Sequence, residues 1–403
     1  MTTRIIRNPL RSPLDLEPPD PEVLAFHRRM PAYSATPMFD APMIAARLNV
    51  GRVLVKAETQ RLGLPSFKIL GASWATYKAL CDHIGHDPEP WANINSLAAN
   101  LAHLRPFELA AATDGNHGRA VAFMARLLGF SAHIFVPQGT VGARIAAIKS
   151  EGARVTVVAG DYDAAVERSA LEADDRCLVI SDTSWAGYET TPRRVIEGYG
   201  TIFAEVDDAL AASGLGSPDV VVIPVGVGAF MSAAVRHYRA HPDPSHYDPA
   251  HLDYSHPDTS RTVVVSVEPS SANCVQASVE AGELAVVPGP HSSMMVGLNC
   301  GTPSMIAWPT VSRGVDWFVS VDDDVAAGAM RELAAAGVVA GETGAAALAG
   351  LSELCGSGLA HQDLHPDSTV LIVVTEGATD RDNYEAIVGR SAESIGRILV
   401  NAS

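Results

Sequence analysis

The first candidate for chemistry is a lysine placed between an irregular segment and a helix. Gly63 and Pro65 interrupt the chain before Lys68, and a run of good helix formers follows Gly71. A lysine fixed near a helix N-terminus feels the positive end of the helix dipole, which disfavours its ammonium form. Its amine is then easier to deprotonate, as an imine-forming lysine requires. An exposed loop lysine is the commoner alternative, so the interpretation depends on residues further along the chain.

A second candidate follows an apolar strand at residues 113–118, Thr-Asp-Gly-Asn-His-Gly. Ligands of open parallel sheets bind at the carboxyl ends of strands, where helix N-termini offer free N–H groups. Asp114 or Asn116 can there hydrogen-bond a ring hydroxyl or act as a base. Taken alone, this segment is more often a simple helix N-cap, because Asn and Asp are favoured at that position.

A third candidate is the glycine turn at residues 224–230, Pro-Val-Gly-Val-Gly-Ala-Phe, which ends a strand and opens a helix. Successive backbone N–H groups in such a turn bind anions, and the helix dipole adds to this. Met231 stands where the dinucleotide fingerprint needs its third glycine, and the Gly-Lys-Ser/Thr ending of a nucleoside-triphosphate loop is absent. A single phosphate monoester is therefore the better prediction.

Two more polar residues end apolar strands in the same way. Thr375 is followed by Glu-Gly, and its hydroxyl can reach a heteroatom at the carboxyl edge of a sheet. Asp182 follows the strand candidate that begins at Cys177 and is expected at the same edge. A turn or a cap explains either residue alone. The fourteen histidines show no metal-ligand spacing, so no metal site is expected.

The elements that must position these residues alternate regularly between apolar strands and amphipathic helices. Such alternation predicts an α/β protein with mostly parallel, twisted sheets covered by helices. The expected strands are 53–58, 109–113, 132–137, 154–158, 177–182, 220–224, 262–268, 317–321 and 370–375, and the expected helices include 70–81, 116–128, 141–150, 162–173 and 190–211. We expect two domains, a larger discontinuous one (1–75 and 195–403) and a smaller one (76–194), with a polar insertion at 241–259.

Composition narrows the classes of partner. The formal net charge of -17 over 403 residues argues against nucleic acid or an anionic membrane as a partner. No stretch is long and apolar enough to span a bilayer. The five scattered cysteines form no Cys-x-x-Cys pair, which favours reduced thiols in a cytoplasmic protein.

Taken together, the lysine after Ser-Phe, the Asp-Gly-Asn-His-Gly strand end, the glycine turn and the Thr-Glu-Gly-Ala-Thr-Asp strand end resemble the fold-type II pyridoxal 5'-phosphate enzymes. Their order and spacing are most similar to those of the diaminopropionate ammonia-lyases. Further similar segments are 58–75, 181–189, 295–303 and 341–345, so the resemblance runs from about residue 35 to residue 390.

The resemblance implies a role for each matching position. Lys68 would bind the cofactor as an imine, and Asn116 would contact its ring hydroxyl. Thr375 would contact the pyridine nitrogen, and Asp114 and Asp182 would be the family's two acidic catalytic residues. The phosphate would lie on the backbone of the glycine turn, which comprises Gly226, Val227, Gly228, Ala229 and Phe230.

The implied reaction is the elimination of ammonia from 2,3-diaminopropionate, giving pyruvate and ammonia in amino-acid catabolism. Two carboxylates near a β-ammonium favour this substrate over one with a neutral β-hydroxyl group. The alternatives are a serine or threonine dehydratase, or a β-replacement enzyme, of the same fold. From another class, a non-catalytic sensor of the cofactor or of an amino acid stays open, although Lys68 argues against it. A homodimer is the family expectation.

Overall fold

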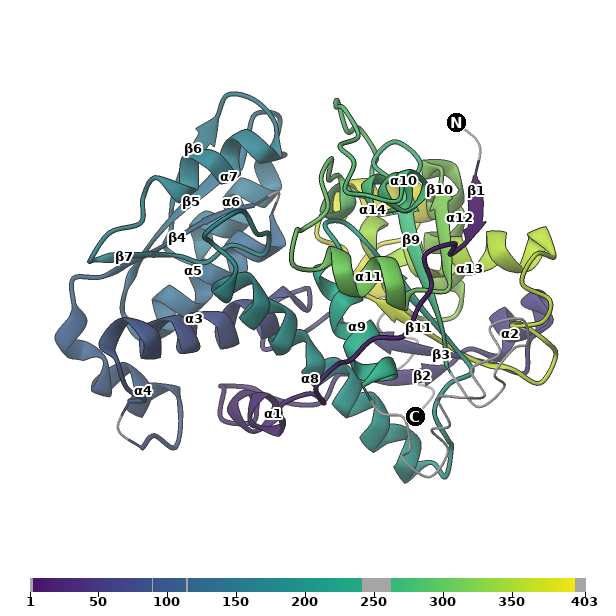
Figure 1. Cartoon of the computed structure of the whole chain (residues 1–403), viewed down its shortest axis with the longest axis horizontal. Coiled ribbons are helices and arrows are strands. Elements are labelled where there is room, and N and C mark those ends of the chain that lie inside the picture. The colour runs from purple at the N-terminus through teal and green to yellow at the C-terminus, as the bar shows by residue number, and fades with distance from the viewer. Residues whose placement is uncertain (1–2, 89, 114, 241–261, 396–403) are drawn as a thin grey trace. The chain divides into compact units, whose positions relative to one another are not determined.

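The computed structural model describes residues 3–88, 90–113, 115–240 and 262–395, which form two compact units. The first unit comprises residues 1–19, 36–59 and 202–403, and the second comprises 20–35 and 60–201. Figure 1 traces the elements of each unit. This division places residues 20–35, 60–75 and 195–201 in the second unit, whereas the sequence predicts them in the larger domain. The predicted domain boundaries stay a prediction.

The first unit contains a seven-stranded sheet in the order β1-β10-β9-β8-β11-β3-β2. The inner strands run parallel, and β1 and β2 pair antiparallel at the two edges. The strands are β1 Arg4–Arg7, β2 Met38–Asp40, β3 Arg52–Ala57, β8 Val220–Pro224, β9 Val263–Pro269, β10 Trp317–Val321 and β11 Thr369–Val374. The helices of this unit are α2 Pro42–Leu48, α9 Ala229–Arg239, α10 Cys274–Ala281, α11 Trp308–Gly314, α12 Asp323–Ala335, α13 Glu342–Ser357 and α14 Arg381–Val388.

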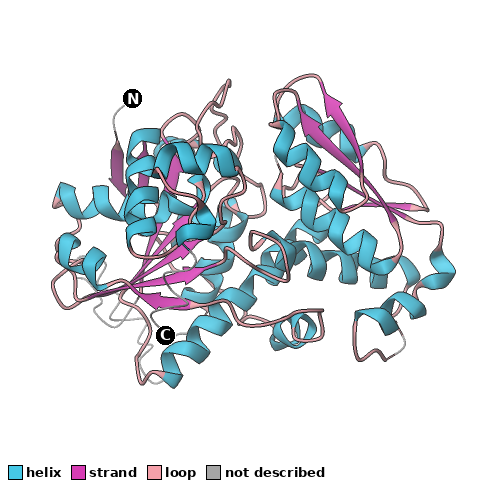
Figure 2. Cartoon of the chain, turned by 180° about the vertical axis from the view of Figure 1, so that it is seen from behind, coloured by secondary structure: helices cyan, strands magenta, loops and turns pink. Residues whose placement is uncertain are grey.

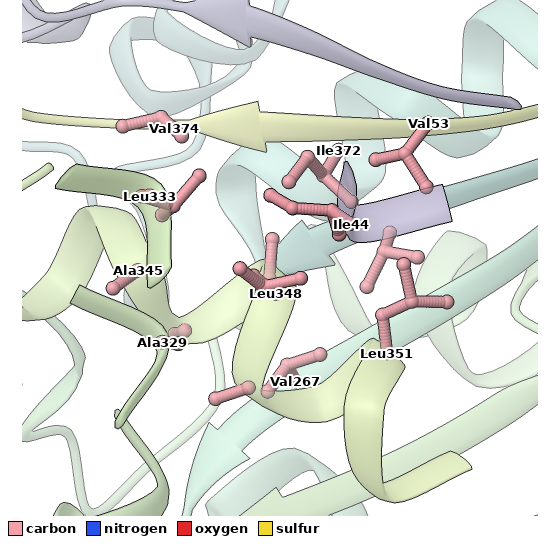
Figure 3. Packing of buried hydrophobic residues seen from close by; sticks show 14 of the residues in the cluster. Ile44, Val53, Val267, Ala329, Leu333, Ala345, Leu348, Leu351, Ile372 and Val374 are labelled. Atoms are coloured by element: carbon pink, nitrogen blue, oxygen red, sulfur yellow. The ribbon is translucent and has the colours of Figure 1, made fainter. Parts of the chain in front are cut away.

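The inner strands β8, β10 and β11 are almost entirely apolar and buried on both faces, as parallel strands covered by helices require. One face packs against α2, α12 and α13 in a large core, part of which Figure 3 shows. Val53 and Ile372 contribute from the strands, and Ile44 and Leu348 contribute from the helices, with no more than 1% of any of these side chains exposed. At roughly 2 kcal/mol for each large aliphatic side chain, this burial supplies a major part of the stabilisation of the unit.

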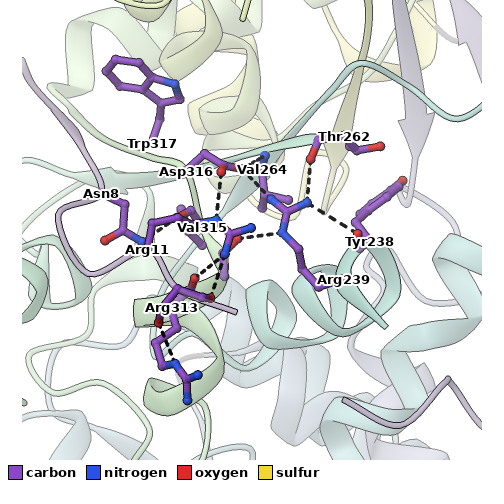
Figure 4. Close-up of polar contacts among 12 residues, drawn as sticks. Asn8, Arg11, Tyr238, Arg239, Thr262, Val264, Arg313, Val315, Asp316 and Trp317 are labelled. Carbon is purple, nitrogen blue, oxygen red and sulfur yellow. Dashed lines mark hydrogen bonds and ion pairs between the residues drawn. The ribbon is translucent and has the colours of Figure 1, made fainter. Parts of the chain in front are cut away.

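The N-terminal segment is held to this unit by a polar cluster around Asp316, shown in Figure 4. Arg11 Nε donates to Asp316 Oδ1 at 3.1 Å, and Arg239 contacts the other carboxylate oxygen. The backbone N–H of Val264 also donates to Asp316 Oδ2 at 2.8 Å. The carboxylate thereby joins the start of the chain to α9 and β9.

The second unit is built on a four-stranded, fully parallel sheet in the order β6-β5-β4-β7. Its strands are β4 Glu108–Ala112, β5 Ser131–Pro137, β6 Arg154–Val158 and β7 Cys177–Val179. Helices pack along these strands, as Figure 2 shows. The helices are α1 Pro21–His27, α3 Lys68–Ile84, α4 Ile94–Asn100, α5 Asn116–Leu128, α6 Gly142–Ser150 and α7 Tyr162–Ala170, and α8 Thr190–Ala212 contains the boundary between the units.

The sheet of the second unit separates two helix layers because successive side chains point to opposite faces. Phe135 packs with Ala165 and Val166 of α7. The neighbouring Ile134 faces α5, where a Cβ on Gly118 would lie 2.6 Å from its Cγ2 atom. The absence of a side chain at Gly118 therefore lets the first turn of α5 approach the end of β4, which is where the candidate residues lie.

The α/β class with mostly parallel sheets is confirmed, and most element bounds shift by only one or two residues. Two differences concern the candidate residues. Helix α3 begins at Lys68, two residues before the expected start. Strand β7 ends at Val179, so the expected strand 177–182 is too long, and Asp182 lies in the loop that follows. The polar segment 241–259 lies outside the described residues.

Among the described residues, no helix has both the length and the apolarity needed to cross a bilayer.

One buried ion pair gives a direct test of the first unit. Lys56 on β3 is 1% exposed, and its Nζ atom lies 2.8 Å from Glu205 Oε2 and 2.9 Å from the carbonyl oxygen of Thr36. The substitution Lys56→Met leaves the buried Glu205 carboxylate without this cation. We expect a loss of about 3–5 kcal/mol in the free energy of unfolding, measured by urea denaturation.

The matched control is Arg381→Met, because Arg381 pairs with Glu393 at the surface, with 77% and 56% of the two side chains exposed. A surface pair contributes at most about 1 kcal/mol. Similar small losses in the two variants would contradict the importance of the buried pair.

Candidate active site

Lys68 and Asp182 meet in the second unit, although they lie far apart in the sequence. Lys68 is the first residue of α3, and its Nζ atom donates to Asp182 Oδ2 at 2.7 Å. The Asp182 side chain is 7% exposed and that of Lys68 is 23% exposed. The position of Lys68 at the helix N-terminus follows the sequence prediction. The partially exposed amine therefore lies against a buried carboxylate that can exchange a proton with it.

Further polar groups hold the Asp182 carboxylate. Tyr162, the first residue of α7, donates its hydroxyl to Asp182 Oδ1 at 3.0 Å. Burial by itself raises the pKa of Asp182, but the charge of His117 in its protonated form, the Lys68 ammonium, and hydrogen bonds from Lys68 and Tyr162 outweigh burial. The pKa of Asp182 therefore lies well below its usual range. Asp182 is a carboxylate at neutral pH in this state of the site.

His117 lies beside the same carboxylate, in the first turn of α5. It is 2% exposed, and its Nε2 atom lies 2.7 Å from the carbonyl oxygen of Ile180. Its Nδ1 atom lies 3.8 Å from Asp182 Oδ2. Burial lowers the pKa of His117, the Asp182 carboxylate offsets part of this effect, and the nearby Lys68 ammonium adds to it. The imidazole is therefore neutral at neutral pH.

Helix α8 supports the start of α3 from the side. The Phe67 and Tyr199 rings lie 4.7 Å apart, and a Cβ on Gly71 would lie 2.6 Å from the Tyr199 ring. A larger residue at Gly71 would therefore displace the turn that carries Lys68. Burial raises the pKa of the Tyr199 hydroxyl, an effect that the nearby Lys68 charge reduces in part. Tyr199 thus stays a neutral phenol beside the amine.

The glycine turn belongs to the first unit and joins β8 to α9. Gly228 caps α9 with a φ of 96°, in the left-handed region that favours glycine. A Cβ on Gly226 would lie 3.1 Å from Cys300 Sγ and 3.3 Å from the carbonyl oxygen of Gly297. Glycine at position 226 lets the turn pack closely against Cys300 and Gly297, and a glycine turn that opens a helix is the arrangement that binds a phosphate.

Thr375 follows β11 in the first unit, as expected. It is 3% exposed, and its Oγ1 atom has no hydrogen-bond partner within the described chain. A buried hydroxyl without a partner costs free energy, so it points to a group that the chain does not supply. A ring nitrogen of a bound cofactor meets this requirement. The residues of the first unit therefore fit the phosphate and the pyridine nitrogen of pyridoxal phosphate.

The structure brings together only some of the candidate residues within one unit. Lys68 and Asp182 are in contact, and Asn116 begins the helix that carries His117. Asp114 lies outside the described residues. The glycine turn and Thr375 are described in the first unit, and the assigned cofactor contacts of all these residues stay predictions.

Three residues around Lys68 and Asp182 are not predicted by the sequence. His117 lies in the strand-end segment, and its place next to Asn116 is the one local signal that points to it. Tyr162 and Tyr199 carried no local signal, because helices separated by long stretches of sequence bring them to the site.

A different group of potential metal ligands occurs elsewhere in the second unit. Atoms of Glu108, His133 and Glu172 lie within 4.8 Å of one another. His133 Nδ1 lies 3.1 Å from Glu172, and Arg168 and Arg154 pair with Glu172 and Glu108. These cations balance the carboxylates, so we interpret the group as an ion-pair network.

The chain is similar in sequence and in structure to known proteins. A family model described as "pyridoxal-phosphate dependent enzyme" matches residues 30–376. The diaminopropionate ammonia-lyase of Salmonella typhimurium is 34% identical over 92% of this chain and 92% of its own, and that of Escherichia coli is 31% identical over 92% and 91%. A crystal structure of the Escherichia coli enzyme in complex with D-serine has a TM-score of 0.82 at 28% identity and covers 96% of this chain and 97% of its own.

The low pKa of Asp182 predicts how its contribution to stability changes with pH. A carboxyl group whose pKa is lower in the folded chain stabilises the fold above its ordinary pKa of about 3.9, and this stabilisation is lost as the pH falls toward the folded-state value. We therefore expect Asp182→Asn to lower the free energy of unfolding, and the difference from the wild type to be larger at pH 6 than at pH 3. Urea denaturation at both pH values measures it, and a difference that grows on acidification would contradict the assigned pKa.

Proposed function

The chain belongs to the family of pyridoxal-phosphate-dependent enzymes, and from this we propose that it is an ammonia-lyase that converts 2,3-diaminopropionate to pyruvate and ammonia. The observation that carries the proposal is the 2.7 Å contact between Lys68 Nζ and Asp182 Oδ2. It places a base and a second proton carrier side by side, as an elimination requires. The similarity to two diaminopropionate ammonia-lyases over 92% of this chain supports the choice of substrate.

Each candidate segment would contact a different part of pyridoxal phosphate. Lys68 would bind it covalently, and Asn116 would contact its ring hydroxyl. The backbone of Gly226, Val227, Gly228, Ala229 and Phe230 would hold its phosphate, and the unpartnered Thr375 hydroxyl would contact its pyridine nitrogen. When bound, the cofactor supplies an electron sink for the carbon that loses a proton.

The chain's own residues then move one proton. The Lys68 amine removes the proton from Cα of one substrate enantiomer. The resulting ammonium can pass that proton to Asp182 Oδ2, 2.7 Å away, and Asp182 can give it to the departing β-nitrogen. The Cα–H and Cβ–N bonds break, and the proton ends on the ammonia that leaves. We assign Asp114 as the base for the mirror-image substrate.

The charge of Asp182 supports diaminopropionate over hydroxyamino acids. Its low pKa keeps it ionised at neutral pH, so it attracts the β-ammonium form of the incoming substrate, and the proton transfer above acts on the neutral β-amine after that group has lost one proton to water. A neutral β-hydroxyl group gains less from an ionised carboxylate. Serine or threonine dehydration and β-replacement are therefore the second choice within the same fold.

The compartment and the assembly are proposed separately. All five cysteines are free, and three of them are buried, which suits a reducing compartment such as the cytoplasm. We propose a cytoplasmic homodimer that binds an amino-acid substrate, in line with the family resemblance. Light scattering of the purified protein would measure the mass, and a monomer would contradict the assembly.

The first experiment is an absorbance spectrum of the purified protein with pyridoxal phosphate, before and after addition of D- or L-2,3-diaminopropionate. We expect a visible absorbance band that Lys68→Ala removes, together with formation of pyruvate and ammonia. Serine and threonine, assayed in parallel, should give much less pyruvate. A band without turnover of diaminopropionate would move the substrate to another β-substituted amino acid. Absence of any protein-bound absorbance band would contradict the proposal that the chain is an enzyme and would leave the sensor hypothesis.

The Thr375 hydroxyl gives a second prediction, in which stability and cofactor binding respond differently. Thr375→Val removes an unpartnered buried hydroxyl and nearly preserves the side-chain volume, so the cofactor-free protein should unfold at the same or a higher temperature. The Kd for pyridoxal phosphate should rise by roughly tenfold, the equivalent of one net hydrogen bond. Differential scanning calorimetry and fluorescence titration measure the two quantities. Unchanged cofactor affinity would contradict the assigned contact.

A further inference from the structure

The ring of His117 is oriented by a single strong hydrogen bond. Its Nε2 atom lies 2.7 Å from the carbonyl oxygen of Ile180, which can only accept a hydrogen bond. Nε2 must therefore carry a proton. Because burial keeps the ring neutral, Nδ1 has a lone pair and no proton. This tautomer makes Nδ1 a base.

The lone pair of Nδ1 is buried next to an acid. Nδ1 has no hydrogen-bond partner among the described residues, and it lies 3.8 Å from Asp182 Oδ2. The same carboxylate oxygen accepts from Lys68 Nζ, while Tyr162 donates to the other oxygen. Oδ2 is therefore the oxygen that can exchange a proton. Lys68 Nζ lies on one side of it as a donor, and His117 Nδ1 lies on the other side as an acceptor.

We propose that His117 is a positioning residue that shares a proton with Asp182 and so keeps that proton available for the departing amino group. The inference rests on the proposed elimination. His117 contacts neither the substrate nor the cofactor in this account and acts through Asp182.

The charge of Lys68 controls this pair. The Lys68 ammonium lowers the pKa of both Asp182 and His117, because it disfavours protons on its neighbours. When Lys68 passes its proton to Oδ2, the ammonium becomes a neutral amine, and the pair becomes more basic. The proton then rests between Oδ2 and Nδ1, where a hydrogen bond from the protonated carboxyl to Nδ1 stabilises it. Only an N–H bond of Lys68 breaks, and an O–H bond forms on Asp182.

The other ionisable groups that face the pair do not compete for this proton. Tyr162 of α7 donates to Oδ1, and burial raises the pKa of Tyr199 of α8. Burial also raises the pKa of Tyr188 to about 12. The Tyr199 and Tyr188 phenols therefore stay protonated near neutral pH, and we assign the proton exchange among the described residues to Lys68, Asp182 and His117.

The substitution His117→Gln tests the proposal in turnover. A glutamine amide can still donate to the carbonyl of Ile180 but has no titratable atom at the position of Nδ1. We expect kcat to fall roughly 100-fold, as for loss of one acid–base function, while KM changes little. The alkaline limb of the pH profile of kcat should move to lower pH, because Asp182 alone loses its proton more readily than the pair does.

The matched control is His133→Gln in the same unit. His133 is 2% exposed, and its ring nitrogens already contact Glu172 at 3.1 Å and Thr156 at 2.8 Å. This variant should keep the wild-type pH profile, whatever its effect on stability. A His117→Gln variant with a wild-type kcat and pH profile would overturn the proposal, as would the same pH shift in both variants.

Nitrogen NMR of histidine-labelled protein without cofactor gives a readout independent of turnover. We expect the His117 signals, assigned by their loss in His117→Gln, to show a protonated Nε2 and an unprotonated Nδ1. In Lys68→Met, His117 should titrate at a higher pH than in the wild type, because the neighbouring ammonium is gone. A proton on Nδ1 in the neutral ring, or a titration that Lys68→Met does not move, would overturn the proposal.

The two measurements separate this inference from the proposed function. If the NMR result holds but diaminopropionate is not consumed, the proton pair stands and the substrate assignment fails. If diaminopropionate is consumed but His117→Gln is unaffected, the function stands and the role of His117 fails.

Discussion

The chemistry of the second unit depends on the burial of one carboxylate. Asp182 is 7% exposed as a side chain, and an ionised carboxylate so far from water must be compensated. Lys68 and Tyr162 provide that compensation by hydrogen bonds at 2.7 Å and 3.0 Å. The same contacts fix the direction of the lysine amine. Stabilising the buried charge and orienting the base are therefore one interaction.

The parallel sheets place these groups where chemistry is possible. In a parallel sheet the strands end at a common edge, and the next helices begin there with free N–H groups. The first turn of α5 follows β4, the glycine turn follows β8, and Thr375 follows β11. Each of these candidate residues is thus close to a strand end and a helix start. Glycine occurs where a side chain would obstruct the approach, as at Gly118 and Gly226.

Local patterns predict the fold, and they also mark the candidate site residues, because both kinds of signal lie within one short segment. The apolar strands and the helix starts are such signals, and so is a lysine placed before a run of helix formers. Strand β7 was predicted too long because Ile180 and Ser181 are buried without belonging to the strand, and periodicity does not separate these cases. The sequence does not predict the edge strand β1, because two isoleucines between two arginines give almost no hydrophobic periodicity. Pairing with β10 creates it.

The contacts of His117, Tyr162 and Tyr199 could not be predicted from the sequence, for a different reason. Their contacts with Lys68 and Asp182 join α3, α5, α7 and α8, and only the packed unit brings these elements together. A tautomer such as that of His117 depends on a single carbonyl oxygen 63 residues away in the chain. Sequence identifies which residues are able to exchange protons, and the packing decides which of them do.

The central claim is that Lys68 carries the cofactor, and the chain allows a direct test because its lysines are Lys56, Lys68, Lys78 and Lys149. Borohydride reduction of the protein with pyridoxal phosphate, followed by peptide mass spectrometry, identifies the modified lysine. The account predicts stoichiometric modification of Lys68. Lys56 is buried in an ion pair, and Lys149 is exposed on α6, where the described residues do not enclose its side chain to hold a cofactor in place. Modification centred on Lys78 or Lys149, with Lys68 unmodified, would contradict it.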